Sequence, residues 1–151
     1  MRVRRASVDE AATLTRLARA SKASWGYPEA WLREWGDELT ITAEWIRDNT
    51  AFVAERQGQL VGMVGVGEGG SGPELAHLWI APDCQGHGLG RILVDRARGV
   101  AIARRWPSLR ILSDPYARPF YEHLGAVHVG EVPAPAEGAP NRTLPLLRLD
   151  V

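Results

Sequence analysis

Three glycines lie within five residues of the chain, at Gly86, Gly88 and Gly90. The segment follows a predicted strand and opens a predicted helix. Glycine lets a backbone approach a ligand closely, and a helix start offers N–H groups without acceptors and the positive end of a dipole. The pattern indicates a site for a phosphate or pyrophosphate, although a turn without a ligand would show the same residues.

The residues around this turn narrow the class of phosphate site. No Gly-Lys-Ser/Thr closes the turn, so it is not a Walker loop. The spacing G-x-G-x-G also differs from the dinucleotide fingerprint. From Arg91 to Arg118 there are seven arginines against two acids, a local charge of +5 in a chain of net charge zero. A solvated helix face explains part of this excess, and a ligand with several phosphates explains it better.

The strand before the turn carries two side chains that could accept a proton. His77 titrates near neutrality and could take a proton from an ammonium group, or it could be hydrogen-bonded in the core. Glu74 is the alternative base. The two residues are three apart, so strict alternation puts them on opposite faces, whereas a β-bulge would bring both to one face.

Two motifs in register resemble the GNAT superfamily of acyl-CoA-dependent N-acyltransferases. Gln85-x-x-Gly88-x-Gly90 after a strand resembles its motif A. The stretch from Asp114 to Ala126, with Tyr121 inside it, resembles motif B, usually Asn-x-x-Ala-x-x-x-Tyr-x-x-x-Gly-Phe. The resemblance covers the whole chain. Asp114 stands where Asn is usual and Ala126 where Phe is usual, and an acid can accept but not donate hydrogen bonds.

The resemblance implies acetyl-CoA as co-substrate and an N-acetyltransferase reaction. It implies that Tyr121 protonates the departing thiolate, a role that suits a nearby O–H, although a packed aromatic is the alternative. It implies that the pantetheine arm adds beside the strand, and that the pyrophosphate rests on the turn. The implied cofactor-binding residues are Leu78, Trp79, Ile80, Gln85, Gly86, His87, Gly88, Leu89, Gly90, Arg91, Asp114 and Tyr121.

Four tryptophans between residues 25 and 45 mark the segment that the resemblance assigns to the acceptor amine. Trp25, Tyr27 and Trp31 are the expected substrate-binding residues, because aromatic rings can hold a cation or an apolar chain; most of the aromatics are expected to pack. The acceptor is a small-molecule or protein amine. A catalytically silent acyl-CoA-binding module is the alternative function, and a homodimer is possible.

Composition sets the remaining limits. The chain of 151 residues predicts a single domain over 1–151. Eighteen basic and eighteen acidic residues cancel, which argues against nucleic acid as a partner. The chain contains no apolar run of about 18 residues, the length that predicts a membrane span. The lone Cys84 fits the reducing cytoplasm. Cys84 carries no mark of a nucleophile, and no Cys/His/Asp spacing suggests a metal site.

The elements that must position these groups follow from periodicity. Strands are expected at 1–6, 51–56, 60–68, 74–80, 109–113, 127–132 and 144–149, and helices at 7–21, from Pro28, at 42–49, at 88–105 and at 119–125. The fold class is α/β (α+β mixed), and the resemblance implies a GNAT fold with a twisted mixed sheet of six to seven strands and about four helices. Further expectations are that Leu75, His77 and Trp79 share a face, that Ile92 is buried, and that Pro145 marks an edge strand.

Overall fold

The computed structural model describes all residues 1–151. The chain forms seven strands and five α-helices, close to the ranges that the sequence predicts. The strands are β1 Arg2–Arg5, β2 Thr50–Arg56, β3 Gln59–Gly69, β4 Gly72–Ile80, β5 Ser108–Leu112, β6 Val127–Pro133 and β7 Thr143–Asp150. The helices are α1 Ala11–Ala23, α2 Glu29–Glu34, α3 Ala43–Asp48, α4 Leu89–Ala103 and α5 Arg118–His123, with 3-10 turns η1 Val8–Glu10 and η2 Pro82–Cys84.

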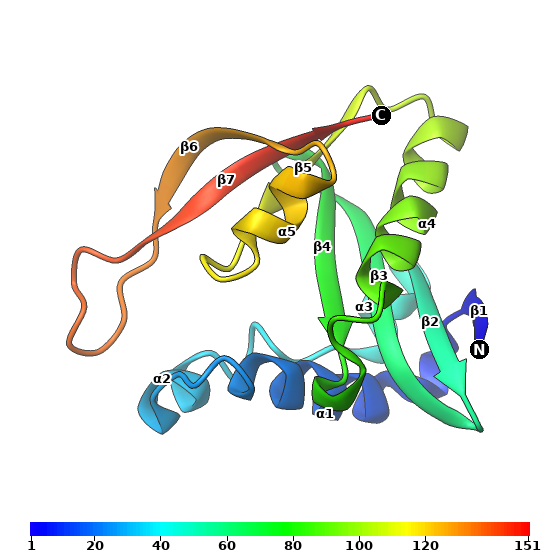
Figure 1. The fold of residues 1–151 in the computed structure, drawn as a ribbon, viewed down its shortest axis with the longest axis horizontal. Helices are drawn as coiled ribbons and strands as arrows, with labels where there is room; N and C mark the ends of the chain where they lie inside the picture. Colours follow the sequence, from blue (N-terminus) through cyan, green and yellow to red (C-terminus); the bar gives the residue numbers. More distant parts are fainter.

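All seven strands form one mixed sheet in the order β1-β2-β3-β4-β5-β7-β6. Every neighbouring pair is antiparallel except β4 and β5, which are parallel and are paired only at Glu74 with Arg110. Beyond that point the two strands separate, and β5, β6 and β7 lean away from β4 (Figure 1). The edge of β4 that faces β5 therefore keeps unpaired backbone groups along most of its length.

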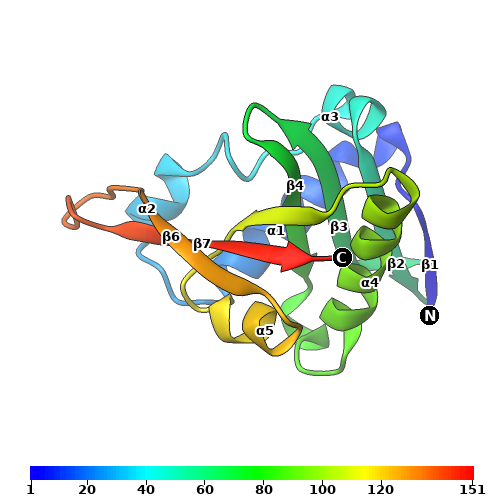
Figure 2. The ribbon, with the colours of Figure 1, turned by 90° about the horizontal axis from the view of Figure 1, so that it is seen from above.

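Helices cover both faces of the first half of the sheet. On one face α4 packs with the main core, in which Val64, Val66, Leu93 and Leu109 are fully buried. On the other face α1 and α3 pack Leu14, Ala18 and Ile46 against Val53 and Met63. Seen from above, β6 and β7 extend away from the β1–β4 layer toward α2 (Figure 2). This arrangement leaves the separation between β4 and β5 as the place where a ligand can enter.

The register of β4 corrects the expected face pattern. His77 pairs with Gly65 and Leu75 with Val66, so Ala76 is an extra residue at a β-bulge. Leu75 consequently packs in the α4 core, while His77 contacts Trp45 of α3, and the three predicted residues do not share a face. Glu74 pairs with Gly67, two residues from Gly65 on β3, so the bulge brings Glu74 and His77 to the same face.

Two other expectations are also wrong. Ile92 of α4 is 47% exposed, because the buried stripe runs through Leu89, Leu93, Val94, Ala97 and Ala101 instead. Pro145 does not mark an edge: β7 lies between β5 and β6, and β6 is the edge strand. The Pro145 carbonyl accepts a hydrogen bond from the amide of Ser113 at the end of β5. Proline lacks the N–H that would point to the same side. That side faces the chain beyond Leu112, the last residue of β5, so no paired strand lacks a donor there.

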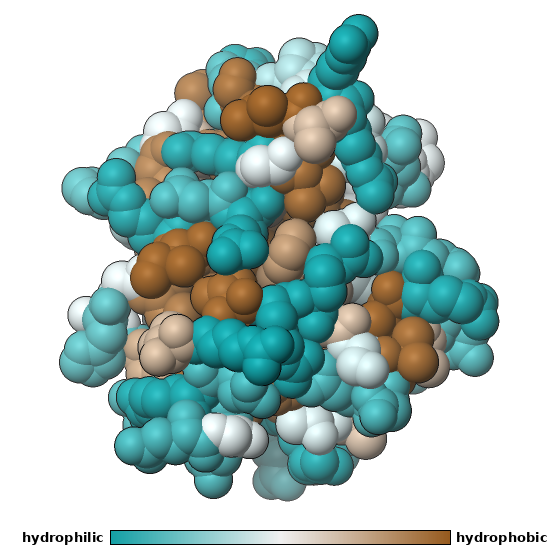
Figure 3. Space-filling view, turned by 90° about the vertical axis from the view of Figure 1, so that its right-hand side faces the viewer, coloured by the Kyte–Doolittle hydropathy of each residue, from teal (hydrophilic) through white to brown (hydrophobic).

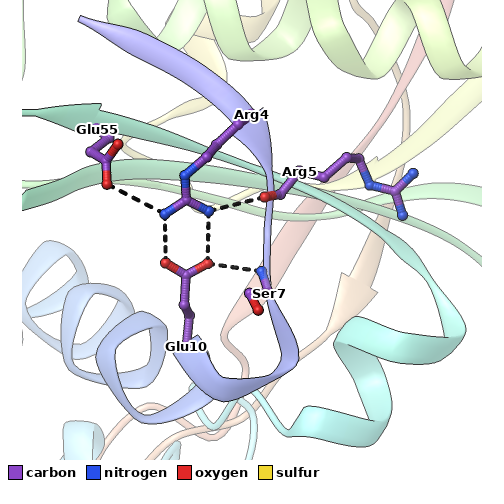
Figure 4. Close-up of polar contacts among 5 residues, drawn as sticks. All are labelled: Arg4, Arg5, Ser7, Glu10 and Glu55. Atoms are coloured by element: carbon purple, nitrogen blue, oxygen red, sulfur yellow. Dashed lines mark hydrogen bonds and ion pairs between the residues drawn. The ribbon is translucent and has the colours of Figure 1, made fainter. Parts of the chain in front are cut away.

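The N-terminal strand is fixed by charged contacts. Arg4 donates two hydrogen bonds to the Glu10 carboxylate, at 3.0 and 2.8 Å, and lies 3.4 Å from Glu55 of β2 (Figure 4). Glu10 also accepts from the amide of Ser7, which forms a capping box. The face that carries α4 and the first two strands is mostly hydrophilic, with small apolar patches between (Figure 3). None of the helices is long and apolar enough to cross a membrane.

Candidate active site

A cleft of about 1250 Å³ occupies the separation between β4 and β5. It runs from the turn before α4, along β4 and past α5, to α2 and the loop between β6 and β7. This volume exceeds the 300–1,000 Å³ of a typical small-molecule pocket. The cleft therefore has room for two ligands that meet at its middle.

The glycine-rich turn presents a row of free amides at one end. The backbone N–H groups of residues 85 to 88 donate to no protein acceptor, and those of residues 89 to 91 lie in the first turn of α4, where helix geometry provides none. Gly86 and Gly88 have φ of +80° and +85°, in the left-handed region that favours glycine. Nothing lies within 4 Å of a Cβ built at either residue. The turn thus has the free amides and open space that the predicted anion site requires.

The remaining residues of the turn have different roles. Gly90 is required by packing, because a Cβ there would lie 2.9 Å from the Phe120 ring of α5. Leu89 is buried in the core, and His87 lines a separate small hollow beside Met1 and Ile92. Leu89 and His87 can therefore serve a ligand only through their backbone amides. Gln85, Gly86, Gly88, Gly90 and Arg91 all line the main cleft.

Tyr121 of α5 lies against the middle of the cleft. The residue is 6% exposed and lines the cavity, and its hydroxyl hydrogen-bonds to no protein group. Burial, with a smaller contribution from Asp114, raises the pKa of Tyr121 above its usual value. The phenol therefore stays protonated at neutral pH, with its O–H free to donate.

His77 is held by two aromatic neighbours. Its Nδ1 accepts a hydrogen bond from the Trp79 indole at 3.1 Å, and Trp45 meets the ring edge-on at a centroid distance of 4.9 Å. Burial lowers the pKa of His77 to about 4. At neutral pH the ring is therefore neutral, with its acceptor nitrogen already engaged.

Glu74 lies at the single contact between the two halves of the sheet. Its carboxylate accepts a hydrogen bond from Arg110 at 3.2 Å, and its side chain is 31% exposed. It lines the cleft on the same face of β4 as His77. Both candidate bases thus face the same ligand space, but only Glu74 has an acceptor atom, Oε1, that no protein group occupies.

Asp114 links the turn before α5 to the N-terminal helices. It accepts hydrogen bonds from Lys22 at 2.5 Å, from the Tyr27 hydroxyl at 2.8 Å and from the Tyr116 amide at 2.8 Å. Its side chain is 11% exposed. The carboxylate that the resemblance assigns to the pantetheine arm is therefore engaged in joining two walls of the cleft.

The aromatic segment contributes differently from the expectation. Trp25 lines the cleft and stacks on Tyr116 at 5.4 Å, as a wall residue should. Tyr27 and Trp31 do not line it. They pack behind Trp35, which does, and the Trp31 indole donates to the carbonyl of Glu137 in the β6–β7 loop at 2.7 Å. Tyr27 and Trp31 therefore support the wall rather than form its surface.

Several cleft residues could not be found by sequence reasoning. Trp35 is indistinguishable in sequence from its aromatic neighbours. Arg142, in the loop before β7, reaches the cleft only because that loop folds back onto α2. Glu34 and Glu38 line the rim and read as an ordinary polar helix face. The side chains of the chain gather no His/Cys/Asp/Glu cluster that could hold a metal ion.

Comparison with known proteins identifies the fold. The chain aligns with a GCN5-related N-acetyltransferase from Rhodopseudomonas palustris at a TM-score of 0.83 and 20% identity, over 99% of this chain and 95% of the other. A PaiA N-acetyltransferase from Thermoplasma acidophilum, solved in complex with coenzyme A, aligns at a TM-score of 0.79 and 17% identity, over 99% of this chain and 98% of the other. A ribosomal-protein-alanine N-acetyltransferase from Brucella melitensis aligns at a TM-score of 0.73 and 19% identity, over the full length of both chains.

The family assignment comes from a separate match. The family model described as "Acetyltransferase (GNAT) family" covers residues 17–126, which include the glycine-rich turn and Tyr121. The match spans more than two thirds of the chain, and the fold with its splayed β4 and β5 agrees with it. The resemblance of the two sequence motifs is thereby confirmed, and the chain belongs to the acetyltransferase (GNAT) family.

Proposed function

We propose that this protein is an acetyl-CoA-dependent N-acetyltransferase that acts on a primary amine. The observation that carries the proposal is one cleft that holds both a row of free backbone amides and the free hydroxyl of Tyr121. The first suits a pyrophosphate, and the second suits a leaving thiolate. A similar protein was solved with coenzyme A, which supports this choice of co-substrate.

The cofactor-binding residues follow from the positions of free backbone groups. The amides of residues 85 to 91 bind the pyrophosphate. The edge of β4 at Leu78, Trp79 and Ile80, which pairs with no strand, receives the pantetheine amides as an added strand would; the Ile80 carbonyl there accepts a hydrogen bond from the Gln85 side-chain amide at 3.3 Å. Asp114 contributes by fixing the wall, since its carboxylate is occupied by Lys22 and Tyr27.

In the proposed reaction the acceptor nitrogen attacks the thioester carbon directly. The new N–C bond forms and the C–S bond breaks, and the Tyr121 hydroxyl donates its proton to the departing sulfur. An acceptor that enters as ammonium gives one proton to a base on β4 before the attack. Its second proton leaves as the amide forms, and the Tyr121 hydroxyl is restored through solvent. Glu74, through a bridging water, suits this role better than His77, because the Nδ1 of His77 already accepts from Trp79 and its pKa is about 4.

The wall opposite β4 favours a small molecule over a protein as the acceptor. The segment that follows α2 and the β6–β7 loop pack together through Trp35, Leu39 and Ala136, so they form a continuous wall at the acceptor end, which suits a small molecule. A catalytically silent acyl-CoA-binding module remains the second candidate. The free hydroxyl of Tyr121 favours the enzyme, because a silent module has no use for a donor at that position.

A thermal-shift measurement tests the co-substrate. A ligand that binds only the folded state stabilises by about 2.7 kcal/mol at 100 times its Kd, which corresponds to a rise in Tm of roughly 5–10 °C for a chain of this size. Acetyl-CoA should produce this shift with the wild type and not with Gly88→Val, which cannot keep the left-handed turn. Gly88→Asn, which tolerates that φ better, is the matched control. A wild type that shows no shift at millimolar acetyl-CoA would refute the assignment.

A further inference from the structure

The aromatic wall of the cleft already contains cations of the chain itself. Tyr27, Trp31 and Trp35 form a cluster with ring centroids 5.0 to 5.9 Å apart. The Arg142 guanidinium lies 4.8 Å from the Trp35 centroid, and the Lys22 ammonium lies 4.9 Å from it. These are cation–π distances. The cluster therefore cannot serve as a cage for a cationic ligand, because the chain's own cations occupy it.

The two cations differ in how their charge is balanced. Lys22 forms an ion pair with Asp114. Arg142 has no carboxylate within 4.0 Å and donates one hydrogen bond, to the carbonyl of Ala134 at 3.2 Å. The Tyr27 hydroxyl also interacts with this guanidinium, but a guanidinium has five N–H donors, so most of them remain without a protein partner. The wall of the cleft thus carries one uncompensated positive charge.

The position of Arg142 is fixed before any ligand arrives. Its guanidinium also lies 5.5 Å from the Trp31 centroid and 5.9 Å from that of Tyr27. Its backbone carbonyl accepts from the amide of Ala134 at 2.9 Å, and the residue is partly buried where it lines the cleft. A planar fork of donors held against aromatic rings is the arrangement that binds a carboxylate in a bidentate manner.

We infer that Arg142 is an anion-binding subsite of the acceptor pocket, so that the preferred acceptor is an amine that carries a carboxylate, such as an amino acid. The inference rests on the proposed function and specifies its acceptor. Glu34 and Glu38 also line the cleft, exposed and without ion-pair partners. Their charges suit the ammonium group with which such an acceptor enters, while Arg142 takes the carboxylate.

Matched pairs of amines test this subsite. Acetylation of phenylalanine and methionine is compared with that of phenylalaninamide and methioninamide, which lack only the carboxylate. The wild type should prefer the carboxylate members in kcat/KM by roughly 10–100-fold, the usual range for a charge-assisted pair of hydrogen bonds. In Arg142→Gln this ratio should fall to about 1, mainly through a loss of kcat/KM for the carboxylate members, while the KM for acetyl-CoA changes little. Phosphoethanolamine against ethanolamine shows whether a phosphate serves as well.

Two further variants separate charge from structure. Arg148→Gln removes an exposed arginine of β7 that pairs with Asp150 outside the cleft, and it should keep the wild-type ratio. Arg142→Lys retains the charge without the fork and should keep part of the preference. Equal rates for both members of each pair, or a preference that survives in Arg142→Gln, would overturn the inference and leave the proposed function standing.

A binding measurement decides the case in which none of these amines is acetylated. Tryptophan fluorescence, which Trp31 and Trp35 make sensitive to Arg142, is titrated with N-acetylphenylalanine and with its amide in the presence of coenzyme A. A saturable change with the carboxylate alone, lost in Arg142→Gln, supports the subsite. The same response to both compounds, or none to either, overturns it.

Discussion

At the scale of single residues, burial sets opposite roles for the two titratable side chains at the middle of the cleft. Burial raises the pKa of Tyr121 and lowers that of His77, because a low-dielectric surrounding disfavours the charged form of each. The phenol stays a proton donor, and the imidazole stays neutral. Tyr121 is therefore suited to act as an acid, whereas His77 is suited to hold Trp79 in place.

Replacing Tyr121 by Phe should lower kcat by roughly 10²-fold, the lower end for a lost general acid. The KM for acetyl-CoA should change little, because one hydroxyl without a protein partner is removed. Steady-state kinetics with acetyl-CoA and an accepted amine measures both quantities, and circular dichroism checks the fold. Unchanged turnover would mean that the hydroxyl takes no part in the rate-limiting step.

The free energy of unfolding should depend on pH through His77. The pKa of His77 is lower in the folded state than its usual 6.5, so the unfolded chain binds a proton first as the pH falls. Stability from this group is therefore complete above about pH 6.5 and lost progressively down to about pH 4, by up to about 3 kcal/mol. Denaturant titrations should show this loss in the wild type and a smaller one in His77→Gln.

The pH dependence of kcat/KM distinguishes the two candidate bases. The acidic limb of kcat/KM should persist in His77→Gln and disappear, with most of the activity, in Glu74→Gln. The reverse result would return the base to His77, as the sequence first suggested.

At the scale of elements, the contact between α4 and α5 positions the acid. The Phe120 ring packs on the first turn of α4, where only glycine fits at position 90. Arg98 of α4 also donates to the carbonyl of Leu124 at the end of α5. The helix that presents free amides therefore holds the helix that presents Tyr121.

Gly90→Ala should push the Phe120 ring away and tilt α5, at about 1–3 kcal/mol for an overpacked contact. Turnover should fall because Tyr121 moves with α5. Gly99→Ala in the same helix is the matched control, since nothing lies within 4 Å of its Cβ, and it should stabilise by about 0.5–1 kcal/mol. Thermal melts and kinetics of both variants check this. Two variants of equal stability and activity would show that α5 adapts without cost.

At the scale of the whole molecule, the two halves of the sheet need ties other than backbone pairing. β4 and β5 share one backbone pair. Asp114, at the end of β5, accepts hydrogen bonds from Lys22 and Tyr27 of the N-terminal segment. This network closes the cleft on the side of α1 and α2 and holds its width.

Asp114→Ala should cost about 3 kcal/mol, because it leaves the Lys22 ammonium largely buried without a partner. Lys22→Met in the same chain should restore part of that loss, since it removes the unpaired charge. Urea unfolding of the two single variants and the double variant gives the coupling energy. Additive effects would show that the pair does not tie the halves together.

The sequence alone determined the order of elements and the chemistry of the turn. Glycines and periodicity act locally, so Gly86, Gly88 and the ranges of most helices and strands could be interpreted without knowledge of distant neighbours. The two motifs around Gly88 and Tyr121 indicated the family for the same reason, since each is a short segment with fixed spacing.

The tertiary structure decided which side chains face the acceptor. The bulge at Ala76 moved Leu75 to the face opposite His77 and Glu74 to the same face, because one extra residue shifts a period of two. Pro145 proved compatible with an inner strand because β5 ends before it. Arg142 joined Trp35 only when the loop between β6 and β7 folded onto α2, 107 positions back along the chain. Contacts across such separations depend on packing of the whole chain, and no local pattern of residues records them.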